Sequence, residues 1–252
     1  MKSLIAFVVA LSAGHAWACS CSNVLDSFPK NGATNVPTNV VIRVLNGFAV
    51  EEQPFRLERL PDGAEVEVQV RRGPGSRLFS VTPVTKLEAN TTYTVSSRNL
   101  TTQSTFTTGA LEDHDTPAKP EFKSAAYAYT PSFDSCGDRR LWTLRIEGGD
   151  DATTAKDELL VLVHGQDSTD PAQAIGVTRF AAPTLDVGVC GDNFDPPSGD
   201  SFTLGLQVMD LAGNVSEVSN GRPIRASCAA VPGELFAMLG LLCFARRRSL
   251  KK

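Results

Sequence analysis

Short runs of alternating apolar and polar residues constrain this chain more than any other feature. Residues 55–60 and 64–70 both alternate, and the Pro-Asp-Gly turn signal 61–63 lies between them. Because successive side chains of a strand point to opposite faces, the two runs predict a β-hairpin with one wet face. One face of the second run is expected to carry its three valines, Val66, Val68 and Val70. No long stretch shows the spacing of an amphipathic helix.

The same rhythm recurs on both sides of a proline-containing acidic segment, residues 110–121. Before it, further short strands are expected at residues 40–45, 77–81, 91–97 and 104–107. After it, strands are expected at residues 141–146, 158–163 and 201–208, with a turn at 210–214. The apolar run 158–163 is typical of a central strand, and Trp142 is expected to be the ring around which two sheets pack. The sequence therefore predicts an all-β chain with two tandem β-sandwich domains.

The first 18 residues predict a cleaved secretory signal peptide. Lys2 gives a positive start, residues 4–11 form an apolar core, and Ala16 and Ala18 are small residues at the cleavage offsets. An apolar run of this length is too short to span about 30 Å of bilayer. Cys19 directly follows Ala18, which leaves lipidation open, although Ala16 stands where a lipoprotein signal prefers a larger aliphatic residue.

The other end of the chain predicts a short hydrophobic helix followed by positive charge. Residues 229–245 are mostly apolar and lack a polar face, and at about 1.5 Å per residue they approach the short limit for a membrane span. The basic cluster that follows, Arg246, Arg247 and Arg248, is expected to stay cytoplasmic and leave the bulk of the chain outside. Exported, C-terminally anchored display at the cell envelope or surface is the predicted location.

Three resemblances to known families accompany these patterns. Residues 29–37 (PKNGATNVP), 87–95 (LEANTTYTV) and 106–109 (FTTG) resemble the bacterial Ig-like domain of S-layer-type envelope proteins. The turn at 210–214 resembles the last hairpin of fibronectin-III-like and Ig-like modules. Ser227-Cys228, the apolar stretch and the arginines resemble a MYXO-CTERM-like sorting tail, which implies that Cys228 is the processed or modified residue.

Together these features divide the chain into six segments. We expect a signal peptide at 1–18, a Cys-containing mature N-terminus at 19–26, an Ig-like sandwich at 27–109, a linker at 110–121, a second Ig-like or fibronectin-III-like sandwich at 122–227 and the sorting tail at 228–252. The linker holds few apolar residues and is expected to be extended and solvated.

The net charge of the chain limits the kinds of binding partner that are expected. Without residues 1–18 and 228–252, 18 Lys and Arg stand against 27 Asp and Glu, a net charge of −9 compared with −4 for the whole chain. Such an acidic ectodomain argues against nucleic acid or an anionic membrane surface as its main partner. The expected partners are the membrane, through the tail, and a surface protein or polysaccharide.

The cysteines predict one structural disulfide. Cys136 and Cys190 each begin a Cys-Gly-Asp triplet in the second unit, and export to an oxidising compartment favours a bond between them. No Cys-x-x-Cys pair or zinc-ligand spacing is present in the sequence. Cys19 and Cys21 are too close for an easy mutual bond, so their partners stay open.

Catalytic patterns are weak, and we predict that the protein is not an enzyme. Gly199-Asp200-Ser201 superficially resembles a nucleophile triplet, but no His follows His164 in the sequence to act as its base. The predicted function is a non-catalytic surface protein that displays two β-sandwich modules for structural or adhesive contacts.

The alternative is an accessory module that recognises a glycan or uses calcium. Loop carboxylates at Asp192, Asp195 and Asp200, with Asp150-Asp151 and Asp167 and Asp170 elsewhere, offer the hard oxygens that calcium prefers. Solvated turn residues are the competing interpretation. A sugar-stacking platform would use exposed rings, for which the candidates are Tyr127, Tyr129, Phe133, Phe180 and Phe194.

Overall fold

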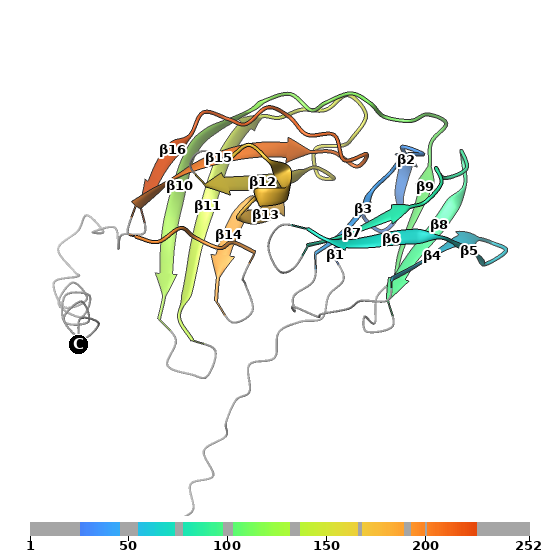
Figure 1. The fold of residues 1–252 in the computed structure, drawn as a ribbon, viewed down its shortest axis with the longest axis horizontal. Coiled ribbons are helices and arrows are strands. Elements are labelled where there is room, and N and C mark those ends of the chain that lie inside the picture. Colours follow the sequence, from blue (N-terminus) through green and yellow to red (C-terminus); the bar gives the residue numbers. More distant parts are fainter. Residues whose placement is uncertain are drawn as a thin grey trace, which may run out of the picture.

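The computed structural model describes residues 26–45, 55–73, 78–97, 103–131, 137–165, 168–188, 193–199 and 201–225 (Figure 1). These residues form sixteen strands in four sheets, and the helical element among them is the short 3-10 helix η1 (Pro171–Gln173). The prediction of an all-β chain is confirmed. The described part of the chain holds no helix long and apolar enough to cross a membrane.

The N-terminal sheet pair consists of strands β1 to β9. Its sheets have the orders β1-β3-β7-β6 and β2-β9-β8-β4-β5, and β2 and β9 run parallel. The strands are β1 (Asp26–Phe28), β2 (Ala33–Val36), β3 (Ile42–Leu45), β4 (Phe55–Leu60), β5 (Ala64–Val66), β6 (Val68–Arg72), β7 (Leu78–Pro83), β8 (Thr92–Ser97) and β9 (Ser104–Thr108).

The C-terminal sheet pair consists of strands β10 to β16, which lie beside the first pair in Figure 1. Its sheets have the orders β10-β11-β14 and β13-β12-β15-β16, with antiparallel pairing throughout. The strands are β10 (Pro120–Thr130), β11 (Arg139–Gly148), β12 (Leu160–Gly165), β13 (Gly176–Arg179), β14 (Thr184–Val187), β15 (Ser201–Met209) and β16 (Arg222–Arg225).

Inward-facing side chains of the N-terminal pair form one apolar core. Both sheets contribute to it, for example Ile42 from β3, Leu57 from β4 and Val95 from β8, each with none of its surface exposed. The buried Tyr93 ring ends at a hydroxyl group that accepts a hydrogen bond from the Glu88 amide at 2.9 Å. Tyr93 thus combines a large buried ring with a polar tip that a backbone amide satisfies.

The predicted hairpin around Pro61-Asp62-Gly63 is confirmed, with β4 antiparallel to β5. The continuous strand expected at 64–70 is wrong, because the chain changes sheet at Glu67: β5 pairs with β4, whereas β6 pairs with β7. Val66 and Val68 pack against the core, but Val70 is 40% exposed. The alternation alone could not reveal the change of pairing partner.

Trp142 is the central ring of the C-terminal pair, as predicted. It is fully buried, and its ring centroid lies 5.0 Å from Tyr127, 5.6 Å from Phe194 and 6.2 Å from Phe202. Because Trp142 lies in β11 and Phe202 in β15, the ring links the two sheets across their shared core.

The position of strand β12 between two apolar clusters explains why its sequence is apolar without alternation. Val161 and Val163 point into the core of the C-terminal pair. Leu160 and Leu162 point the other way, into the cluster that contains the core of the N-terminal pair. A strand buried on both faces has no polar face, which confirms the prediction of a central strand. The two sheet pairs therefore share a continuous apolar cluster.

Polar contacts reinforce this junction. The Lys30 amide donates to Glu158 Oε2 at 3.0 Å, and Lys30 Nζ lies 2.8 Å from Asp157 Oδ2. Arg179 Nε donates to Asp26 Oδ2 at 2.5 Å. Burial raises the pKa of Glu158, and the nearby Lys30 acts in the opposite direction. Apolar and polar contacts thus join segments that are more than a hundred residues apart in the sequence.

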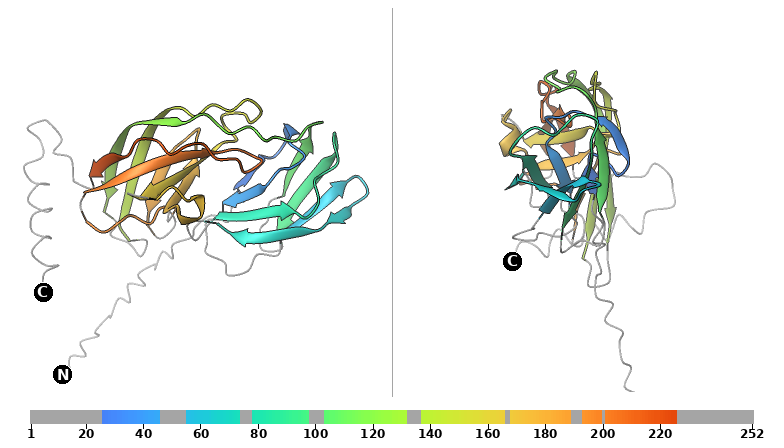
Figure 2. Two further views of the ribbon diagram at one scale, coloured as in Figure 1. Left: turned by 45° about the horizontal axis from the view of Figure 1, so that its top comes forward. Right: turned by 90° about the vertical axis from the view of Figure 1, so that its right-hand side faces the viewer.

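The segment between the sheet pairs runs along one side of the junction, as the left view in Figure 2 shows. It is extended as expected, but the prediction that it is solvated is wrong at Asp113 and Pro117, which are both buried. The amide of Thr38 donates to Leu111 O at 3.0 Å, and that of Ala118 donates to Asp150 O at 2.8 Å. Backbone hydrogen bonds therefore fix this segment to both sheet pairs.

Several predictions fall outside the described residues. These are the signal peptide with Ala18, Cys19 and Cys21, the sorting tail with Cys228, Arg246, Arg247 and Arg248, the C-terminal helix, and the disulfide partners Cys136 and Cys190. They remain predictions.

Candidate metal centre

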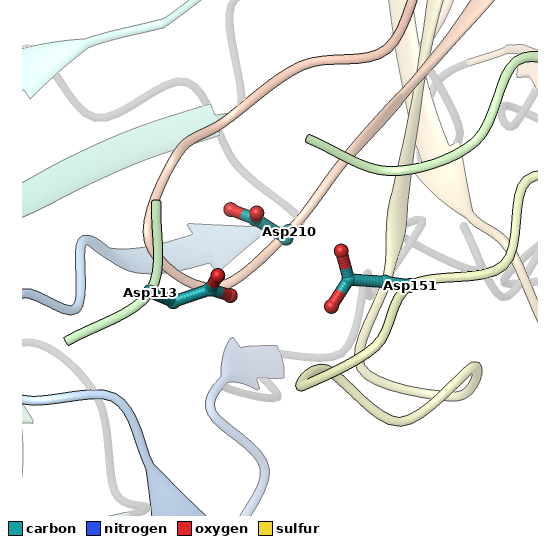
Figure 3. Close-up of side chains that lie close together, drawn as sticks. All are labelled: Asp113, Asp151 and Asp210. Carbon is teal, nitrogen blue, oxygen red and sulfur yellow. The ribbon is translucent and has the colours of Figure 1, made fainter. Parts of the chain in front are cut away.

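Three carboxyl groups from three separate segments meet beside the junction. They belong to Asp113 in the connecting segment, Asp151 in the loop after β11, and Asp210 in the turn after β15 (Figure 3). One oxygen of each lies within 4.8 Å of the others. Asp113 is 2% exposed and Asp210 is 3% exposed. Two of the three negative charges are therefore almost completely removed from water.

The turn after β15 fixes the position of the Asp210 carboxylate. Its Oδ1 accepts hydrogen bonds from the amides of Gly213 at 2.7 Å and Asn214 at 2.8 Å, and its Oδ2 accepts one from Asn214 Nδ2 at 2.8 Å. Gly213 has a φ of +92°, a conformation that side chains of L-residues rarely adopt. The predicted turn is confirmed, and it holds the carboxylate as well as reversing the chain.

Asp151 is bonded through only one of its two carboxylate oxygens. Its Oδ1 accepts hydrogen bonds from the Thr153 amide at 2.9 Å, the Thr153 hydroxyl at 3.0 Å and the Thr154 amide at 2.6 Å. Its Oδ2 is buried and has no hydrogen-bond partner among the described residues. A buried carboxylate oxygen without a donor is costly unless something else neutralises it.

Asp113 is held from the N-terminal side of the junction. Its amide donates to Asn39 Oδ1 at 2.9 Å, and its carbonyl accepts from Asn39 Nδ2 at 2.7 Å. Its Oδ2 accepts from the hydroxyl of Thr153, and its Oδ1 accepts from the Asp115 amide at 3.1 Å. Through Thr153, the carboxylates of Asp113 and Asp151 share one hydroxyl group.

The Arg43 guanidinium supplies positive charge near the cluster. It interacts electrostatically with one of the three carboxylates, that of Asp210. Burial lowers the pKa of Arg43 to about 10, and the Asp210 charge opposes this shift. The Arg43 guanidinium donates to Val41 O and to Met209 Sδ, each at 3.4 Å, rather than to a carboxylate. Burial raises the pKa of Asp210 to about 6, despite the hydrogen bonds from Asn214. No salt bridge among the described residues reaches Asp113, Asp151 or Asp210.

Among the other acidic residues singled out in the sequence, those that the structure describes lie outside this cluster. Asp195 is exposed, and its amide donates to Ile175 O at 2.7 Å. Asp150 is exposed and lies 2.9 Å from Lys156 Nζ, while Asp170 caps η1 by accepting from the Ala172 amide. Asp167, Asp192 and Asp200 lie outside the described residues. Calcium binding at Asp192, Asp195 and Asp200 therefore stays a prediction.

Two of the aromatic residues considered for a sugar platform are core residues. Phe180 is 6% exposed and Phe194 is 3% exposed, so neither offers a ring face at the surface. Tyr127 packs against Trp142, and the Tyr129 hydroxyl donates to Asp138 Oδ2 at 2.6 Å. Phe133 lies outside the described residues.

His164, considered as the base of a hydrolase, is fully buried in β12. Neither ring nitrogen makes a hydrogen bond of normal geometry among the described residues, so neither touches a Ser hydroxyl there. Burial lowers the pKa of His164, although Gln207 and the charge of Asp170 act in the opposite direction. The imidazole is thus a neutral core group.

A surface hollow beside β4, β5 and β8 is lined by charged groups that pair with acidic neighbours. Arg59 donates to Asp62 at 2.7 Å and to Glu88 at 2.5 Å, and Lys86 donates to Glu112 at 2.7 Å. Its cations are therefore already neutralised, unlike the carboxylates of the junction cluster.

The sequence pointed to Asp151 as a possible ligand but not to its two neighbours. Asp113 was assigned to a solvated linker and Asp210 to an ordinary turn. The three residues are 38 and 59 positions apart, so no local spacing connects them. Only the packing of the connecting segment against both sheet pairs brings them together.

Comparisons with known proteins find weak similarities to solved structures. No family model matches the chain, and no curated protein matches it. Among solved structures, it is similar to a biofilm associated protein BSP domain at 15% identity, covering 81% of this chain and 30% of that one, with a TM-score of 0.25. The chain is also similar to a pullulanase complexed with maltotriose, from Anoxybacillus sp. LM18-11, at 13% identity. This match covers 76% of this chain and 24% of that one, with a TM-score of 0.24.

L,D-transpeptidase 3 from Mycobacterium tuberculosis is similar at 12% identity. This match covers 78% of this chain and 90% of that one, with a TM-score of 0.27. This chain spans less than a third of the biofilm protein and of the pullulanase. Likenesses of this size assign neither a family nor an activity.

Proposed function

We propose that this chain is an exported, non-catalytic surface protein that holds two Ig-like β-sandwich modules outside the membrane. The observation that carries the proposal is the apolar cluster shared by the two sheet pairs, in which Leu160, Leu162 and Met209 pack with the core of the N-terminal pair. Modules joined by a common core cannot swing freely. A stiff body of this kind suits the projection of a surface away from a cell.

The two ends of the sequence support the location. The apolar start with Ala18 at its cleavage site favours export, and the apolar tail followed by Arg246, Arg247 and Arg248 favours attachment at the envelope. The acidic ectodomain favours contact with a surface protein or polysaccharide over contact with nucleic acid. The work of the protein would be structural or adhesive.

Whole cells that produce the full chain test this proposal. Antibodies against the protein should label intact cells, and protease added outside should remove the label. A chain ending at Ala226 should be released into the medium, whereas the full chain with Asp150→Asn, an exposed position far from both ends, should stay on the cells. A full chain that resists both reagents until the cells are broken would contradict surface display.

Loss of the gene tests the adhesive role. Cells without the protein should attach less to one another or to a surface, and the full chain should restore attachment. If cells without the protein attach as well as the parent cells, whose surface is labelled normally, the adhesive function is contradicted. Surface display would still stand.

A further inference from the structure

We propose that Asp113, Asp151 and Asp210 bind one calcium ion, which joins the connecting segment to two loops of the C-terminal sheet pair. The three carboxyl groups lie close together (Figure 3). The buried Asp151 Oδ2, which no donor in the described structure satisfies, is an independent observation that points to a bound cation.

The distances fit a single ion. Calcium binds oxygen at about 2.4 Å, so two ligands on opposite sides of the ion lie at most about 4.8 Å apart. One oxygen from each of the three carboxylates lies within 4.8 Å of the others. The spacing of the three oxygens is therefore compatible with one shared ion.

The donor atoms select the class of metal. All three are carboxylate oxygens, which are hard ligands, and the shared Thr153 hydroxyl adds a fourth oxygen at the same place. Among the described residues, no Cys sulfur or imidazole group, which zinc or copper would prefer, belongs to the cluster. Magnesium demands near-ideal octahedral geometry and releases its water reluctantly. A cluster in which two of the three carboxylates are almost fully buried therefore favours calcium.

The charge balance also calls for a cation. Asp113 and Asp210 are almost fully buried, and the Arg43 guanidinium, which donates to Val41 and Met209, offsets one of the three carboxylates at most. A divalent ion would cancel the remaining charge.

The site lies where its occupation would matter to the whole molecule. The Asp113 carbonyl accepts from Asn39 of the N-terminal pair at 2.7 Å. Leu211, the residue after Asp210, packs in the shared cluster, and its carbonyl accepts from the Val41 amide at 2.8 Å. An ion held by Asp113 and Asp210 would therefore stabilise the junction between the two sheet pairs.

Equilibrium dialysis of the purified full-length chain against calcium, followed by metal analysis, tests the stoichiometry. We expect one ion per chain for the parent protein and more than a tenfold loss of affinity for Asp151→Asn. Asp150→Asn is the matched control, because Asp150 is the adjacent residue and its exposed carboxylate pairs with Lys156. It should bind as the parent does.

Thermal unfolding gives a second readout. At a tenfold excess over the dissociation constant, calcium should raise the Tm of the parent by about 4 °C and leave that of Asp151→Asn unchanged. Asp113→Asn replaces Asp151→Asn if the latter does not fold, as judged by its strand circular dichroism in chelator.

Three outcomes would overturn the proposal. They are no bound calcium in the parent, equal binding by Asp151→Asn and the parent, and a magnesium-induced Tm rise that equals or exceeds the calcium-induced one. Binding is measured on purified protein and display on whole cells, so either proposal can fail while the other stands.

Discussion

At the scale of single residues, burial changes the chemistry that the side chains can perform. His164 has none of its surface exposed, and this burial lowers its pKa. In the sequence it was the one His in the second unit and thus a conceivable base. In the structure it is a core side chain, because the face of β12 that carries it is covered. The alternation of apolar and polar residues in the sequence cannot show that this face of the strand is covered.

We predict that His164 makes the protein less stable in mild acid. The unfolded chain binds a proton near the ordinary His pKa of about 6.5, whereas folded His164 resists protonation. Below about pH 6.5 the unfolded state therefore binds more protons, and stability falls as pH falls towards the lowered pKa. Between pH 7 and 5.5 the loss should be about 1 kcal/mol. Urea unfolding at both pH values measures it.

The variant His164→Leu isolates this contribution from those of other titrating groups. Its free energy of unfolding should change less between pH 7 and 5.5 than that of the parent, by the same amount of about 1 kcal/mol. Identical pH dependence in the two proteins would show that His164 is not the group responsible.

At the scale of elements, β12 is the strand on which both cores depend. Leu162 faces the shared cluster and Val163 faces the core of the C-terminal pair. The sequence predicted a central strand from the absence of alternation, and this was correct. It could not say what covers the second face, because that cover comes from strands of the N-terminal pair.

We predict that Leu162→Ala lowers the free energy of unfolding by about 3 kcal/mol, because it opens a cavity in the shared cluster. Val70→Ala, at a position that is 40% exposed, is the control and should change it by less than about 0.5 kcal/mol. Urea denaturation of the three proteins gives both values. A cost below about 1 kcal/mol at Leu162 would mean that the two sheet pairs do not pack there.

The pairing of β11 with β14 bears on the predicted disulfide. Arg140 lies opposite Val187 in this antiparallel pair, so the chain before β11 and the chain after β14 leave the sheet at the same end. Cys136 and Cys190 are four and three residues beyond this pair. Both cysteines lie outside the described residues, so the Cys136–Cys190 bond stays a prediction.

Peptide mapping without reduction should find Cys136 and Cys190 in one linked peptide pair. Because the bond would close a loop of about 54 residues, the chain-entropy model predicts that Cys136→Ser with Cys190→Ser lowers the free energy of unfolding by about 4 kcal/mol. Recovery of both cysteines as free thiols from the exported protein would contradict the bond.

At the scale of the whole molecule, the shared cluster makes the two sheet pairs interdependent. Contacts on both sides of it add to this, including those of Lys30 with Glu158 and of Arg179 with Asp26. The connecting segment is hydrogen-bonded to both pairs rather than hanging as a free tether.

We predict that residues 26–225 unfold in one cooperative transition, because neither sheet pair keeps its full core without the other. Scanning calorimetry of the full-length chain should give a calorimetric enthalpy equal to the van't Hoff enthalpy. Two separated transitions would show that the sheet pairs are independent units joined by a linker.

The sequence by itself determined the all-β class, most of the strands, the turns at 61–63 and 210–214, and the central ring Trp142. These follow from short-range patterns, since alternation and turn residues act over a few positions. Only the tertiary structure decided the sheet change at Glu67, the burial of His164 and the meeting of Asp113, Asp151 and Asp210. Each of these depends on contacts between segments far apart in the chain, and such contacts leave no periodicity in the sequence.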